Sequence, residues 1–147
     1  MGKYRRLTHV VYKCDYHIVF TPKYRFRILT GHVLSTLEHD IRTICEWKDV
    51  VVEEMNIQPD HVHMVVSIPP KVSVSDFMGI LKGKTAIKLF KSYPNLKKKP
   101  YWGNHFWARG YFVNTVGLDE DMIRRYVKYQ EDEERKAEQD RQDFTLF

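Results

Sequence analysis

Two histidines separated by one residue, His61 and His63, are the first feature of the sequence that suggests chemistry. They open an apolar run, 61–68, that is typical of a strand, and side chains two apart in a strand project from the same face. Two imidazoles on one face of a rigid strand supply half of a metal site; two polar residues on a solvated face are the alternative. Asp60 directly precedes His61 and would either orient a ligating imidazole or serve only the turn.

A second pair with chemical potential, Tyr126 and Gln130, is four residues apart near the C-terminus. In a helix this spacing places both side chains on one side, one turn apart. The phenol of Tyr126 could act as a nucleophile and the amide oxygen of Gln130 as a metal ligand. Tyr129 and Glu133 have the same spacing and form a rival pair, and Tyr126 could also be a packing residue of an amphipathic helix.

Basic residues gather in two segments that suit contacts with phosphates, although a solvated surface would look the same. The first segment has a helical pattern and the second alternates cations with aromatic rings, a mixture that suits stacking of unpaired bases. The candidate DNA-binding residues are Lys82, Lys84, Lys88 and Lys91 in the first segment and Lys23, Arg25 and Arg27 in the second.

Residues 79–85 superficially resemble a phosphate-binding loop, because they combine two glycines with a Lys-Thr pair. The spacing between the glycines is one residue too short, and the segment lies inside a helical pattern instead of following a strand. No nucleotide cofactor is therefore expected.

The order of the predicted elements defines the fold class. Strands are predicted over 12–20, 50–57, 61–68 and 105–116, and helices over 32–47, 73–93 and from 119 onward. Two strand–helix–strand units predict an α+β fold, a ferredoxin-like or RRM-like antiparallel sheet with helices on one face. In this layout the strands 12–20 and 61–68 are central, and the additional C-terminal helix carries Tyr126.

The 147 residues suit a single domain whose charge is unevenly divided. Residues 1–118 hold 18 Lys+Arg and 9 Asp+Glu, a net of +9, whereas residues 119–147 hold 6 and 10, a net of −4. A basic body with an acidic C-terminal helix and tail points to a polyanionic partner. Cys14 and Cys45 are isolated and suggest neither a disulfide framework nor a thiolate zinc site. Without a long apolar run, a cytoplasmic protein with no membrane partner is expected.

Taken together, these parts resemble the single-tyrosine HUH transposases, the TnpA proteins of the insertion-sequence 200/605 family. The resemblance covers most of the chain, which would then be one HUH transposase domain over 1–147. The segments that carry it are 16–25, 59–66, 77–84, 106–113 and 126–130.

The resemblance implies that His61, His63 and Gln130 hold Mg²⁺ or Mn²⁺ and that Tyr126 is the nucleophile. It implies cleavage and rejoining of single-stranded DNA at element ends through a 5′-phosphotyrosine, recognition of DNA hairpins, and a homodimer in which Gly117 is a candidate hinge. The alternatives are a domesticated, repeat-associated relative, an HUH replication nuclease, and a non-catalytic RRM-like nucleic-acid-binding protein.

Overall fold

The computed structural model describes residues 4–98 and 105–115. The hinge candidate Gly117 and the predicted C-terminal helix after it, with Tyr126, Tyr129 and Gln130, lie outside the described residues.

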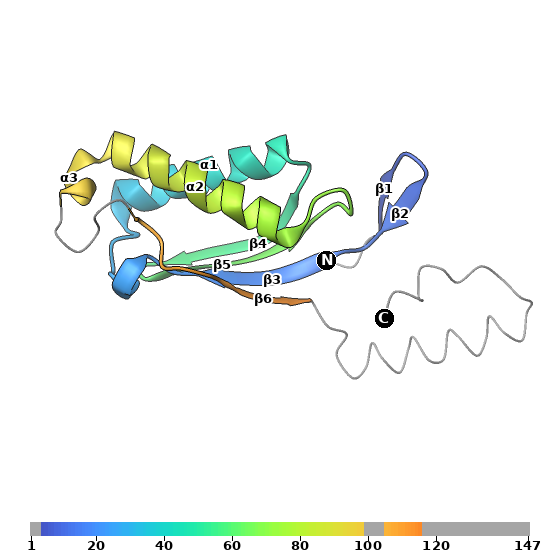
Figure 1. Cartoon of the computed structure of the whole chain (residues 1–147), viewed down its shortest axis with the longest axis horizontal. Coiled ribbons are helices and arrows are strands. Elements are labelled where there is room, and N and C mark those ends of the chain that lie inside the picture. The colour runs from blue at the N-terminus through green and yellow to red at the C-terminus, as the bar shows by residue number, and fades with distance from the viewer. Residues whose placement is uncertain (1–3, 99–104, 116–147) are drawn as a thin grey trace, which may run out of the picture.

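A four-stranded antiparallel sheet is the centre of the fold (Figure 1). It consists of β3 (Asp15–Phe20), β4 (Val51–Gln58), β5 (His61–Ser67) and β6 (Phe112–Thr115), in the spatial order β4-β5-β3-β6. The helices α1 (Gly31–Trp47) and α2 (Val74–Ser92) pack against each other over one face of the sheet. The predicted α+β fold is confirmed, with β3 and β5 as the two central strands.

The core lies between the helices and the sheet because each element turns one apolar face inward. On β5, Val62, Met64 and Val66 are fully buried, and Ile18 and Phe20 join them from β3. From α1 and α2 the fully buried residues recur at three and four positions, the helical period. They are Leu37 and Ile41 on α1 and Phe77, Met78, Leu81, Thr85 and Leu89 on α2.

A β-bulge in β4 keeps its apolar residues on the core face. Val52 pairs with Val66, but the next pair along the ladder joins Glu54 to Val65, so Glu53 is an extra residue in this strand. Because a shift of one residue exchanges the two faces of a strand, the bulge directs Met55 and Ile57 toward the core and leaves Glu54 on the opposite face.

The start of α2 follows from a helix cap. Ser73 adopts an extended conformation, and its Oγ accepts a hydrogen bond of 3.0 Å from the backbone N–H of Asp76. The cap satisfies one of the unpaired donors of the first turn. Ser73 is therefore the N-cap of α2.

Two predicted strands differ from the structure. The strand over 12–20 is divided, because Tyr12 belongs to a separate hairpin of β1 (Arg5–Leu7) and β2 (Val10–Tyr12), which extends beyond the end of the sheet (Figure 1). The strand over 105–116 is reduced to β6, because Gly110 has a φ of +77° that breaks the extended backbone.

Two short helical segments complete the described fold: η1 (Lys23–Arg25) after β3 and α3 (Pro94–Lys97) after α2. Among residues 4–98 and 105–115, no helix is long and apolar enough to cross a membrane.

Candidate functional site

His61 and His63 lie on the face of the sheet opposite the helices. They alternate along β5 with Val62 and Met64, which are completely buried in the core, whereas both histidines are partly accessible. The side chain of His61 is 32% exposed. The sequence prediction that the two imidazoles share one face, away from the core, is therefore confirmed.

Asp60 connects His61 to the basic segment after β3. Its Oδ1 lies 2.9 Å from Nδ1 of His61, and its Oδ2 accepts a hydrogen bond of 2.9 Å from Nη2 of Arg25. The hydrogen bond with His61, followed by that with Arg25, holds the pKa of Asp60 below its usual value. A carboxylate at Nδ1 fixes the orientation of the ring and leaves Nε2 of His61 as the nitrogen for a ligand.

A third histidine, His17, lies beside His63 on the same face. The two Nε2 atoms are 2.7 Å apart, and the ring centroids are separated by 4.4 Å. The register explains the proximity, because His63 on β5 is opposite Val19 on β3, and His17 is two residues from Val19 on the same face. The sequence reasoning missed His17 as a site residue, although the predicted adjacency of the two central strands could have identified it.

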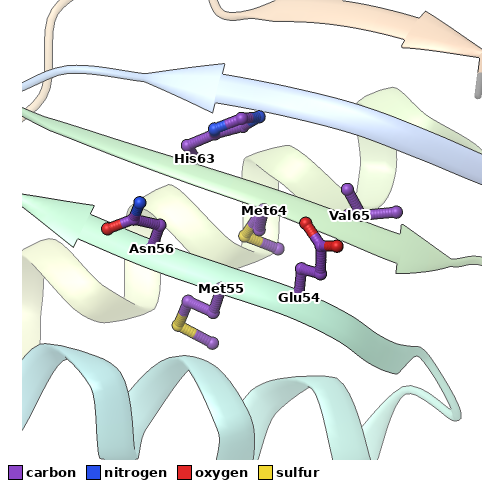
Figure 2. Close-up of a pocket in the computed structure, with 6 residues that line it drawn as sticks. All are labelled: Glu54, Met55, Asn56, His63, Met64 and Val65. Carbon is purple, nitrogen blue, oxygen red and sulfur yellow. The ribbon is translucent and has the colours of Figure 1, made fainter.

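A shallow cavity of about 420 Å³ opens beside His63 (Figure 2). Its lining on β4 includes Glu54 and Asn56, and Asn56 is directly opposite His63 in the strand register. The open face of the sheet therefore combines imidazoles with a carboxylate and an amide, all of which are potential ligands or hydrogen-bond partners of a polar substrate.

The described residues fit the imidazole part of a divalent-metal site. His61 is oriented by Asp60, and His63 presents its Nε2 on the same face, where it contacts His17. No group of three or more His, Cys, Asp or Glu side chains within residues 4–98 and 105–115 is arranged to hold a metal ion. A complete site would need a further donor, and the predicted one, Gln130, lies outside the described residues.

The candidate DNA-binding residues divide between the two sides of the molecule. Lys23 and Arg25 lie in η1, and the contact of Arg25 with Asp60 brings this segment next to His61. Lys23 lies over the ring of Tyr24, with Nζ 5.3 Å from the centroid, and Arg27 follows two residues later. Lys84, Lys88 and Lys91 are exposed on α2, which covers the opposite face of the sheet.

Lys82 has a structural role that the sequence reasoning did not identify. Its Nζ donates hydrogen bonds of 2.8 and 2.7 Å to the backbone carbonyls of Ala108 and Gly110. Burial lowers the pKa of Lys82. Because the ammonium is directed toward these carbonyls, Lys82 fastens the segment before β6 to α2.

Comparisons with known proteins agree with one another. Residues 10–130 match the family model described as "Transposase IS200 like". The transposase for insertion sequence element IS200 from Salmonella typhimurium is 44% identical over 139 residues, which cover 95% of this chain and 91% of the relative. The ISDra2 transposase TnpA from Deinococcus radiodurans is 36% identical over 125 residues, which cover 84% and 89% of the two chains.

A solved structure supports the same relationship. The crystal structure of a candidate transposase from Deinococcus radiodurans superimposes with a TM-score of 0.70 and 29% sequence identity. The superposition covers 87% of this chain and 96% of the solved one.

Proposed function

The chain belongs to the family of IS200-like transposases, and we propose that it cleaves and rejoins single-stranded DNA at the ends of an insertion element, with Tyr126 as the nucleophile. Membership of the family makes it a DNA-processing enzyme. The observation that carries the finer proposal is the pair His61 and His63 on the open face of the sheet, with His61 oriented by Asp60.

In this proposal His61, His63 and Gln130 hold a divalent cation, Mg²⁺ or Mn²⁺. Such a cation would polarise the scissile phosphate and stabilise the charge that develops on the leaving 3′ oxygen. Asp60 holds Nδ1 of His61, so that Nε2 faces the site. The chain's own contribution is therefore a fixed orientation of at least one imidazole before the DNA arrives.

Tyr126 supplies the nucleophile. Its phenol oxygen attacks the phosphorus in line, a new P–O bond forms, and the bond between phosphorus and the 3′ oxygen breaks. The products are a 5′-phosphotyrosine and a free 3′-OH, which takes up one proton. Because the phosphotyrosine conserves the phosphoester bond, attack by a second 3′-OH releases Tyr126 and joins two strands without a nucleotide cofactor.

The basic segment after β3 is the proposed contact for the strand near the site. Arg25 is bound to Asp60, and Lys23 and Arg27 flank it in sequence. The ring of Tyr24 is 63% exposed, as a surface for an unpaired base would be. Hairpins near the element ends are the proposed recognition elements, and a homodimer with Gly117 as hinge is the proposed assembly.

The test is the formation of a covalent protein–DNA adduct on a single-stranded element end in the presence of Mn²⁺, measured on a denaturing gel. The unchanged chain should form the adduct, and Tyr126→Phe should abolish it because the nucleophilic oxygen is removed. Tyr129→Phe is the matched control and should retain it. His61→Ala and His63→Ala should each reduce the adduct strongly, since each removes a proposed ligand.

Three outcomes would contradict the proposal in different ways. Full adduct with Tyr126→Phe would remove Tyr126 from the mechanism, and loss only with Tyr129→Phe would identify the rival tyrosine. Binding of DNA without any cleavage in Mg²⁺ or Mn²⁺ would instead indicate a non-catalytic nucleic-acid-binding protein.

A further inference from the structure

Trp47, the last residue of α1, is a large aromatic side chain on the surface of the helix layer. It is 61% exposed, whereas Trp107 is 7% exposed in the core. Most of the Trp47 side chain is therefore accessible to a ligand. The accessible part of the indole is a flat aromatic surface on which a nucleobase can stack.

Two lysine ammonium groups lie next to this ring. Nζ of Lys48 is 4.7 Å from the ring centroid, and Nζ of Lys84, from α2, is 5.3 Å from it. We call Trp47, Lys48 and Lys84 the Trp47 cluster. Since Lys84 comes from the other helix, the cluster spans the junction between α1 and α2, and its position is fixed by the packing of the two helices.

Positive charge continues along α2 beyond the cluster. Lys88 is one helical turn from Lys84, and both are exposed. The two ammonium groups act together on the half-buried carboxyl of Asp40 on α1, where they oppose the rise in its pKa that burial causes. Another nearby carboxylate, that of Asp49, is paired with Lys71 at 2.9 Å. Next to the ring the exposed carboxylate of Glu46 is outnumbered by the ammonium groups of Lys48 and Lys84, and this excess of positive charge favours an anionic ligand.

The described residues leave the space next to Gly83, the residue before Lys84, open. Gly83 lies within α2 and is exposed, and a Cβ atom added there would meet nothing within 4 Å in the described part of the chain. Alanine would favour the helix more than glycine does. Gly79 on the same helix is equally open, so neither glycine is required by packing against the described residues.

From this geometry we propose that the Trp47 cluster binds an unpaired nucleobase of DNA, with the indole as the stacking surface and Lys48 and Lys84 as contacts for the flanking phosphates. This inference rests on the proposed function, because it takes single-stranded DNA as the ligand. It adds a second DNA site on the helix side of the sheet, opposite the face that carries His61 and His63.

The present contacts of the ring do not prevent stacking. An ammonium group over an exposed ring is held weakly, whereas a base stacked on an aromatic side chain is held more strongly. A base can therefore displace one ammonium from the indole. The displaced lysine has a flexible stem and can move to an adjacent phosphate, so the cation–π contact is replaced by a charge-assisted hydrogen bond.

An unpaired base could come from an unstructured strand or from the loop of a hairpin, and the oligonucleotides in the test separate the two sources. The probes are a twelve-residue oligothymidylate, a DNA hairpin with a thymine loop, and a fully paired duplex. Each is added to the full-length chain carrying Tyr126→Phe, which prevents cleavage, while tryptophan fluorescence and fluorescence anisotropy of the labelled DNA are recorded.

We expect the oligothymidylate, the hairpin or both to quench tryptophan emission, with little quenching by the duplex. Adding Trp47→Leu should remove most of this quenching and raise the Kd for the quenching probe by about fivefold or more. Lys84→Gln should weaken binding and reduce its salt dependence. Val11→Ala, which truncates an exposed apolar side chain on the β1–β2 hairpin, is the matched control and should leave Kd unchanged.

The outcomes separate this inference from the proposed function. Unchanged quenching and Kd in the Trp47→Leu variant would overturn the Trp47 site, while adduct formation in Tyr126-containing protein could still confirm the function. Conversely, loss of quenching without any adduct would support a base-binding site on a protein of another activity. A change in sedimentation with Trp47→Leu and no change in DNA binding would overturn the proposal in favour of a protein interface.

Discussion

The Nε2 atoms of His17 and His63 lie 2.7 Å apart between the two central strands. Only one proton can occupy the space between two neutral imidazole nitrogens, so one ring donates and the other accepts. In either arrangement Nε2 of His63 is engaged, and a metal ion at that nitrogen must break the contact. His17 is therefore directly coupled to the proposed ligand site.

The first prediction concerns His17→Ala. Because metal binding would no longer have to break the hydrogen bond, the Kd of Mn²⁺ should fall by about two- to tenfold, as expected from a net hydrogen-bond contribution of about 0.5–1.5 kcal/mol. Titration of free Mn²⁺ by electron paramagnetic resonance measures the change. A weaker affinity would show instead that His17 positions His63 or is itself a ligand.

The second prediction concerns the carboxylate that holds His61. Asp60→Ala removes the partner of Nδ1, and we expect Mn²⁺ affinity to fall by about 10- to 100-fold, as is typical of residues that orient metal ligands. Asp60→Asn keeps an oxygen that can accept from Nδ1–H and should lose less. Arg25→Ala is the control, because it leaves the contact between Asp60 and His61 in place. If Arg25→Ala lowered Mn²⁺ affinity as much as Asp60→Ala, the effect would come from charge and not from the orientation of His61.

The third prediction concerns a buried hydrogen bond that joins the segment before β6 to α2. The hydroxyl of Thr85 is completely buried, donates to the carbonyl of Leu81 at 2.7 Å and accepts from Nε1 of Trp107 at 2.9 Å. Thr85→Val leaves the indole N–H without this partner and should lower the free energy of unfolding by about 1–3 kcal/mol. Thr85→Ser retains the hydroxyl and should cost less in urea denaturation. A larger loss with Thr85→Ser than with Thr85→Val would mean that the methyl group, not the hydrogen bond, stabilises this contact.

The fourth prediction concerns alkaline pH. Burial raises the pKa of Cys45 to about 12, and its side chain belongs to the core. The pKa of a cysteine thiol in the unfolded chain is about 8.5. Between this pH and the folded pKa of about 12, the folded state keeps a proton that the unfolded state has lost. The contribution of Cys45 to stability is complete below that range and decreases as the pH rises through it.

The expected slope between pH 9 and pH 11 is a loss of about 1 kcal/mol in unfolding free energy for each pH unit. Chemical denaturation at several pH values measures it, and Cys45→Ala should have a lower stability at pH 7 but a smaller decrease above pH 9. An identical decrease in both proteins would assign the alkaline effect to other groups.

Several features of the site follow directly from patterns in the sequence. The alternation of His61 and His63 with Val62 and Met64 defines both the strand and its polar face, because a side-chain period of two leaves no other arrangement. The order of strands and helices predicts that β3 and β5 are neighbours. Membership of the core follows from the same periodicities.

Other features depend on packing that no local pattern reveals. The bulge at Glu53 occurs where two glutamates are adjacent, so the sequence does not show which one is extra. The contact between Lys84 and Trp47 depends on how α1 and α2 are aligned, and that between Lys82 and the carbonyl of Gly110 on the path of an irregular segment. The strand predicted over 105–116 was too long because aromatic and β-branched residues favour strands even where a glycine turns the chain.

The two faces of the sheet impose a spatial order on any DNA that would use both. The helices and the Trp47 cluster lie on one side and the histidines lie on the other, and over residues 61–64 of β5 histidines alternate with core residues. A nucleotide bound at the Trp47 cluster could not be the nucleotide that is cut. The DNA strand that joins the two nucleotides would have to pass around an edge of the sheet. Substitutions on α1 and α2 could then alter which element ends are selected, while the chemistry on the other side stays unchanged.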